Sequence, residues 1–101
     1  MSAEFKTGRG VYRLIIAAPP ETDGGAITLT LALERADGIE RVAFCCRIEG
    51  AIKSGESQPG DGVLIELVAP AIEREFEAIR EAALKSIRSE RKLAAITIST
   101  S

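Results

Sequence analysis

Few side chains in this chain could carry out chemistry, and none stands in the spacing of a known catalytic motif. The candidates are Glu66, Tyr12, Cys45 and Arg47. The Glu66 carboxylate could act as a general base if burial raised its pKa. Cys45 could act as a redox nucleophile, because Arg41 and Arg47 on the same face of its expected strand could lower the pKa of the thiol. No spacing selects these residues over other polar side chains, so the sequence predicts no catalytic residue and favours a protein that is not an enzyme.

The residue types that the chain lacks restrict its chemistry further. It contains no histidine and no tryptophan, and a Ser-His-Asp or Cys-His nucleophile needs an imidazole. Two cysteines are too few for a metal site built from cysteines alone within one chain. Cys45 and Cys46 are adjacent, so on a strand their side chains point to opposite faces. We therefore expect two reduced thiols, one of them in the core, with no metal and no cofactor.

Composition and charge are typical of one soluble domain. The chain has 101 residues, of which 46% are hydrophobic and 28% charged, as in ordinary globular domains. The net charge of −2 argues against a nucleic-acid binder, which usually carries a basic excess. No apolar run approaches the roughly 20 residues that span a bilayer, and residues 1–10 lack the apolar segment of a signal peptide. We therefore expect a cytoplasmic protein with no membrane association.

The strongest structural pattern is a hairpin between residues 26 and 50. Two alternating runs flank Asp37-Gly38, a dipeptide that favours the positive φ angles of a tight two-residue turn. This turn pairs residues whose numbers sum to 75, so that Leu31 faces Phe44. One face of the hairpin is then apolar throughout, and we expect it in the core: Leu29, Leu31, Leu33, Val42, Phe44 and Cys46.

The rest of the chain predicts three further strands and one helix. Strands are expected at residues 11–18, 63–68 and 93–100, after a flexible lead-in over residues 1–10. Pro70 is typical of the first helical position, and a helix is expected from there to about Lys92. Apolar residues recur along it at helical spacing: Ile72, Phe76, Ile79, Ala83 and Ile87.

This β-β-β-β-α-β order predicts a two-layer α+β domain over residues 11–101. The expected architecture is a mainly antiparallel sheet of four to five strands, with one long helix on its Leu-rich face. The C-terminal strand could pair with another strand of the same chain after the helix, as in a crossover unit. It could equally pair with a second copy, and the sequence leaves both arrangements open.

The sheet face opposite the helix is the expected partner-binding surface. Small side chains flanked by charges suit the close approach of another protein. The residues predicted to bind the partner are Thr28, Thr30, Arg41, Ala43, Cys45 and Arg47. The first functional hypothesis is therefore a non-enzymatic interaction module, which forms a homodimer or binds a protein partner through this face or a sheet edge.

The sequence leaves two alternatives to the interaction-module hypothesis open. A single-stranded nucleic-acid-binding domain would need basic contacts and exposed aromatic side chains for stacking; its contacts would come from Arg13, Arg41, Arg47 and Lys53. The other alternative is a small-molecule-binding domain or an enzyme with carboxylate or thiol chemistry. The sequence identifies neither the partner nor the pathway.

Overall fold

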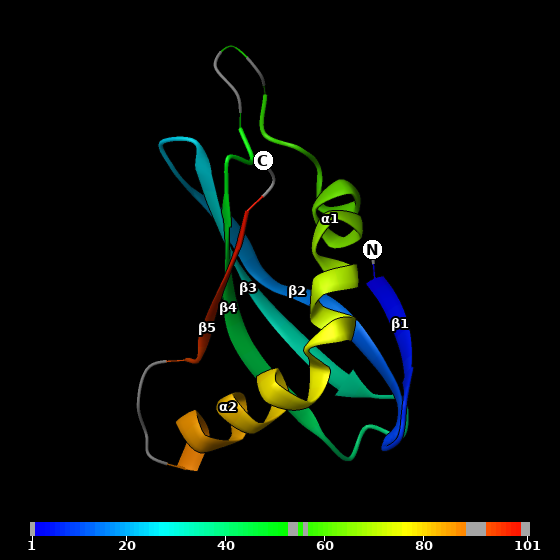
Figure 1. Cartoon of the computed structure of the whole chain (residues 1–101). Coiled ribbons are helices and arrows are strands. Elements are labelled where there is room, and N and C mark those ends of the chain that lie inside the picture. Colours follow the sequence, from blue (N-terminus) through cyan, green and yellow to red (C-terminus); the bar gives the residue numbers. More distant parts are fainter. Residues whose placement is uncertain (1, 53–54, 56, 89–92, 100–101) are drawn as a thin grey trace.

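The computed structural model describes residues 2–52, 55, 57–88 and 93–99 and contains one curled sheet with two helices (Figure 1). The elements are β1 Ser2–Thr7, β2 Gly10–Asp23, β3 Ala26–Arg35, β4 Arg41–Glu49, α1 Asp61–Arg74, α2 Phe76–Arg88 and β5 Ala95–Ser99. The five strands follow one another across the sheet in chain order. The β1–β2, β2–β3 and β3–β4 pairs are antiparallel and the β4–β5 pair is parallel. The expected α+β class with a mainly antiparallel sheet is thus confirmed.

The central hairpin has the predicted register along its whole length. Leu31 pairs with Phe44 and Glu34 with Arg41, so the paired numbers sum to 75. The connection is longer than the expected two-residue turn, because the last backbone bond joins Arg35 N–H to the Glu40 carbonyl at 2.9 Å. Gly38 has the positive φ angle, +76°, that favours glycine. The apolar face of the hairpin is fully buried, as predicted.

The expected lead-in over residues 1–10 is wrong for residues Ser2–Thr7, which form the edge strand β1. β1 pairs with Gly10–Ile15 of β2 through a turn at residues 8–9. The inward side chain Phe5 is buried in the core, while Glu4 and Lys6 are exposed. This alternation has the period of a strand, but one large apolar residue in six made the signal weak.

Residues 63–68, expected as a strand, lie in the N-terminal part of α1. The buried residues of α1 are Leu64, Ile65, Val68 and Ile72. Successive members are one, three and four positions apart, as on one face of a helix. Val63 is exposed, whereas a strand pattern would bury it together with Ile65. A short apolar run fits both periods. The helix therefore begins at Asp61, and Pro70 lies inside it instead of at its start.

The single long helix that was expected is divided at Glu75. Pro70 lacks the N–H that would bond one turn back, which weakens α1 near its end, and Glu75 has non-helical angles of φ −108° and ψ 21°. α2 then runs in a new direction (Figure 1). α1 packs on β1 and β2, and α2 packs on β4, so the break lets the helical layer follow the curved sheet.

The predicted apolar stripe stays buried across this break. Ile72, Phe76, Ile79 and Ala83 all belong to the core. The side chain of Ile87 and the expected helix end at Lys92 lie outside the described residues.

The C-terminal strand pairs within the chain. β5 lies parallel to β4, with Ile96 beside Cys46 and Ile98 beside Ile48. Ile96 and Ile98 are half-buried against the core. Of the two arrangements left open by the sequence, the crossover from β4 through both helices to β5 is therefore the one that the structure contains.

Candidate functional site

The sheet has one face without helices, here called the outer face, and it carries all six predicted partner-binding residues. Thr28 pairs with Arg47 across β3 and β4, and Thr30 pairs with Cys45. Ala43 pairs with Ala32, and Arg41 with Glu34. Arg41 is exposed and the other five predicted residues are half-buried. The structure therefore brings the set together on two neighbouring strands, as the hairpin register requires.

Charged side chains border the outer face at two ends. One row runs across four strands with alternating sign: Glu4, Arg13, Glu34 and Arg41. Within this row Arg13 Nη2 lies 3.1 Å from Glu34 Oε1.

At the other end, Arg47 Nε lies 2.7 Å from Glu49 Oε1, and Arg47 Nη1 lies 3.5 Å from Asp23 Oδ2. Between the two ends the side chains are small or apolar: Ile15, Thr30, Ala32, Ala43, Cys45 and Ala95. The middle of the outer face thus carries small or apolar side chains, and charged side chains lie at two of its ends.

The edges of the sheet differ in how they are protected against pairing with another strand. β1 carries the charged residues Glu4 and Lys6. Beyond Ile15, β2 has no β1 partner, and this part contains Pro19 and Pro20 with two shifts of register. Charges, prolines and bulges are the usual devices that prevent edge-to-edge association. β5, with the sequence AITIS, has none of them in its described residues.

A polar cluster inside the molecule joins three distant segments. The Tyr12 hydroxyl donates a hydrogen bond of 2.6 Å to Glu40 Oε1. Arg80 donates two more to the same carboxylate, from Nε to Oε1 and from Nη2 to Oε2, each at 2.7 Å. The Arg80 and Glu40 side chains are only 15% and 19% exposed. The cluster ties β2 and the β3–β4 connection to α2.

The electrostatics of this cluster favour a structural role over acid–base catalysis. Hydrogen bonds from the Arg80 guanidinium and, to a smaller extent, from the Tyr12 hydroxyl lower the pKa of Glu40 from an ordinary value of 4.5 to about 2, although burial opposes the shift. Burial raises the pKa of Tyr12, and the hydrogen bond to Glu40 adds to this shift. Tyr12 is fully buried and its ring meets the edge of Phe76 at a centroid distance of 4.7 Å. A carboxylate so strongly stabilised is a poor base.

Sequence reasoning singled out Tyr12 but missed Glu40 and Arg80. Tyr12 and Glu40 are 28 positions apart in the sequence, and Glu40 and Arg80 are 40 positions apart. No local sequence pattern links side chains at such separations. Glu40 sits in a loop and Arg80 on the flank of a helix, where charged residues are ordinarily solvated. Only the fold brings them together.

The four candidate enzyme residues are not brought together. Tyr12 is in the core and Glu66 is exposed on α1, whereas Cys45 and Arg47 lie on the outer face. Arg47 is engaged by Glu49 and Asp23. These positions provide no shared site for carboxylate or thiol chemistry.

The two thiols have different surroundings, as predicted from their adjacent positions. Both cysteines are free; Cys46 is buried in the core and Cys45 is half-buried. Desolvation raises the pKa of the Cys46 thiol to about 12. Cys46 is therefore protonated and unreactive at neutral pH.

The part of the surface that the structure describes lacks the exposed aromatic side chains of a single-strand nucleic-acid site, and Lys53 lies outside the described residues. The four aromatic residues of the chain are Phe5, Tyr12, Phe44 and Phe76, and none is more than 5% exposed. Base stacking needs exposed aromatic side chains. Five arginines are also ion-paired with carboxylates: Arg9, Arg13, Arg35, Arg47 and Arg80.

Within the described residues, no three acidic or cysteine side chains gather as a metal site. No helix there is long and apolar enough to cross a membrane. Comparisons with protein-family models, with curated proteins and with solved structures give no match for this chain.

Proposed function

We propose that this protein is a non-enzymatic interaction module that forms a homodimer by pairing β5 of one copy with β5 of another. The observation that carries this proposal is the unequal protection of the sheet edges. β1 carries charges and the free part of β2 carries prolines and register shifts, whereas the described residues of β5 have neither. An unprotected, β-branched edge strand is a ready template for another strand.

The backbone of β5 has the right groups turned outward for such pairing. The Cys45 N–H donates to the Ala94 carbonyl at 2.7 Å, and in a parallel ladder the bonds to one neighbour come from alternate residues. Ala94, Ile96 and Ile98 therefore face β4. The N–H and C=O groups of Ala95 and Thr97 consequently point toward the free edge.

A two-fold axis through Thr97 would make the interface self-complementary. Antiparallel pairing about that axis sets Ile96 of each copy opposite Ile98 of the other, on the helix side of the sheet. Both side chains are half-buried in the single chain, so pairing would remove more of their apolar surface from water. β5 contains no charged residue, so no like charges would face each other across the axis. Two-fold interfaces of this kind are the commonest in homodimers.

Dimerisation through β5 would also join two outer faces into one surface. β4 is the neighbour of β5, and Cys45 pairs with Ala95 while Arg47 pairs with Thr97. The predicted partner-binding residues of the two copies would then flank the axis. Five paired residues make a small interface, which corresponds to a weak dimer.

The test is the solution mass of full-length protein by analytical ultracentrifugation from 10 to about 500 µM. Thr97→Pro removes one outward N–H and leaves the bonds to β4 in place. Thr97→Val is the matched control, because it keeps the N–H and the β-branched shape. We expect concentration-dependent dimerisation of the wild type and of Thr97→Val, and a monomer for Thr97→Pro. A monomeric wild type at the highest concentration, or an unchanged dimer in Thr97→Pro, would refute the proposal.

A further inference from the structure

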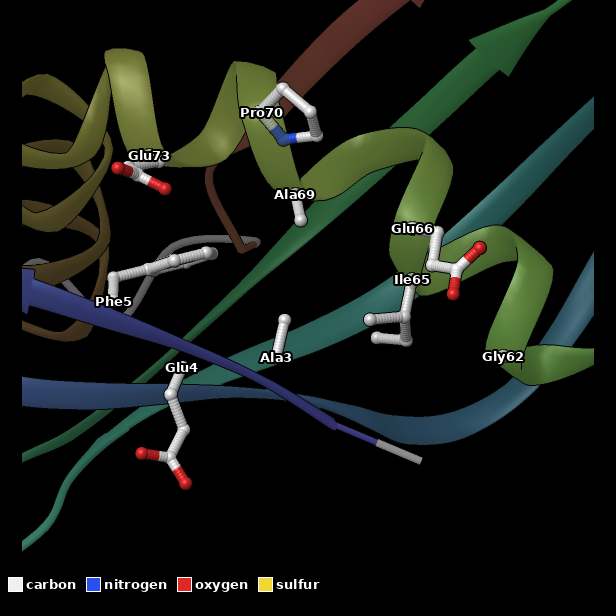
Figure 2. A pocket seen from close by; sticks show the side chains of 9 residues that line it. All are labelled: Ala3, Glu4, Phe5, Gly62, Ile65, Glu66, Ala69, Pro70 and Glu73. Carbon is white, nitrogen blue, oxygen red and sulfur yellow. The ribbon is translucent and has the colours of Figure 1, made fainter.

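A groove of about 380 Å³ lies between β1 and α1, on the side of the molecule opposite β5. Phe5 and Ile65 line its base and are only 3% and 2% exposed. Figure 2 shows the side chains of Ala3 and Phe5 on the strand side and those of Ile65 and Ala69 on the helix side of one apolar channel. The groove is thus a preformed apolar trough beside an edge strand.

The charges around this trough have one sign. The ionisable side chains on its helix side are Glu66 and Glu73, and no lysine or arginine is among the lining residues, while the Glu4 side chain points away from α1 (Figure 2). Glu66 and Glu73 are exposed on α1, seven residues apart, which is about 10 Å along a helix axis. Elsewhere Glu34, Glu40 and Glu77 are paired with arginines, but Glu66 and Glu73 form no ion pair with any described residue. Their charge is available to an occupant.

The strand side of the groove adds directional hydrogen-bonding groups. β1 pairs with β2 on one side only and stands at the end of the sheet. In an antiparallel pair, alternate residues direct their N–H and C=O groups away from the partner strand. Half of the backbone groups of β1 therefore face outward beside the groove, where an extended peptide could continue the sheet.

Lysine and arginine side chains suit both the apolar base of the groove and the carboxylates beside it. Their long stems can lie on apolar surface while the charged end stays in water or meets a carboxylate. On an extended peptide, side chains two positions apart lie on one side at about 7 Å. Flexible stems at that spacing can reach carboxylates about 10 Å apart. The same negative charge disfavours a phosphate-bearing ligand.

We propose that the groove between β1 and α1 binds an extended, lysine- or arginine-bearing segment of a partner protein, which adds as a strand to β1. The outward backbone groups of β1 form hydrogen bonds with the segment, and the apolar trough binds the methylene stems of its lysines or arginines. Glu66 and Glu73 form ion pairs with their charged ends. The charges on β1 that prevent indiscriminate pairing are compatible with a partner chosen by charge. This site uses the opposite edge of the sheet from β5 and does not depend on dimerisation.

Binding can be measured by fluorescence anisotropy with the labelled probe peptide Ala-Lys-Val-Lys-Val-Lys-Ala. The double variant Glu66→Gln, Glu73→Gln should bind about five-fold more weakly, as the loss of two exposed charge pairs predicts. The double variant Glu21→Gln, Glu81→Gln removes the same charge from exposed sites outside the groove, and it should bind like the wild type. Equal weakening in both variants would mean non-specific attraction and would refute the site.

A second probe separates strand addition from charge attraction. The same peptide, N-methylated at alternate residues, keeps its lysines but cannot form the backbone ladder, and we expect its binding to be lost. Amide NMR shifts caused by the unmodified peptide should concentrate in β1 and α1. Unchanged binding of the methylated peptide, or shifts concentrated elsewhere, would overturn the proposal. The monomeric Thr97→Pro variant should bind the peptide like the wild type, so a failed dimer would leave this result intact.

Discussion

Replacing Glu40 by glutamine should remove most of the free energy that the Tyr12–Glu40–Arg80 cluster contributes to folding. The pKa of Glu40 falls from 4.5 to about 2 in the folded protein. Each pKa unit corresponds to 1.36 kcal/mol, so the shift is worth about 3 kcal/mol. Because the carboxylate is only 19% exposed, screening by water removes little of this value. A loss of about 2 to 3 kcal/mol is large against a typical domain stability of 5 to 15 kcal/mol.

The sign of the pKa shift sets the pH at which this loss appears. A carboxyl group with a lowered folded pKa stabilises the fold above its unfolded pKa, and the contribution disappears as pH falls through the folded value. The full difference between wild type and Glu40→Gln should therefore be seen above pH 5. It should shrink between pH 4.5 and 2, where the wild-type carboxylate takes up its proton.

Urea unfolding followed by far-ultraviolet circular dichroism at pH 7 and pH 2.5 measures the loss of unfolding free energy in Glu40→Gln and its dependence on pH. Glu34→Gln is the control, because it removes a carboxylate paired with Arg13 at a more exposed site. It should cost less than about 1 kcal/mol at either pH. A difference between wild type and Glu40→Gln that is the same at both pH values would refute the reasoning.

A double-mutant cycle with Arg80→Met separates the ion pair from packing. Removing one partner leaves the other charge poorly compensated in a half-buried site, whereas removing both avoids that cost. We expect the double variant Glu40→Gln, Arg80→Met to be more stable than the sum of the single losses predicts. Strict additivity would show that the two groups are not coupled.

Three further predictions concern single residues. Alkaline titration of the tyrosinate absorbance reports Tyr12 alone, and its pKa should lie above 10; stability should fall as pH rises from 10 toward that value. A thiol reagent at pH 7 should label no more than Cys45 in the folded protein, and should label Cys46 as well only in denaturant. Gly38→Ala should lower the free energy of unfolding by about 1 kcal/mol, because alanine is strained at φ +76°, and thermal melts would show an unchanged midpoint if this were wrong.

The hairpin was predictable because two independent signals agreed on it. The Asp37-Gly38 turn and the alternation of apolar residues each specify the same register, and a slip of one residue would exchange core and surface. The pairing is as expected from Ile27 opposite Ile48 to Glu34 opposite Arg41. The outer face follows directly from that register, so its residues were predictable to the same extent.

The helical layer was less predictable because its local signals conflict. Residues 63–68 alternate like a strand and also fit a helical stripe, and the period could be decided only by the sheet that α1 covers. Pro70 is common at helix starts, yet here it lies inside α1. Its effect is the weakened end of α1 before Glu75.

The features that depend on the fold could not be predicted from local sequence. The Glu40–Arg80 pair and the groove beside β1 each combine residues from segments far apart in the chain. Neither leaves a pattern within a window of helix or strand length. The groove also depends on β1, whose short alternation carried little signal.

The parallel position of β5 has a consequence for the order of folding. β1 to β4 form successive hairpins between sequence neighbours, whereas both helices separate β4 from β5 along the chain. Contacts between distant residues form late because a long loop must close first. Until then β4 is the edge of the sheet in the growing chain. Its charged residues Arg41, Arg47 and Glu49 would keep that temporary edge from pairing with neighbouring chains during synthesis.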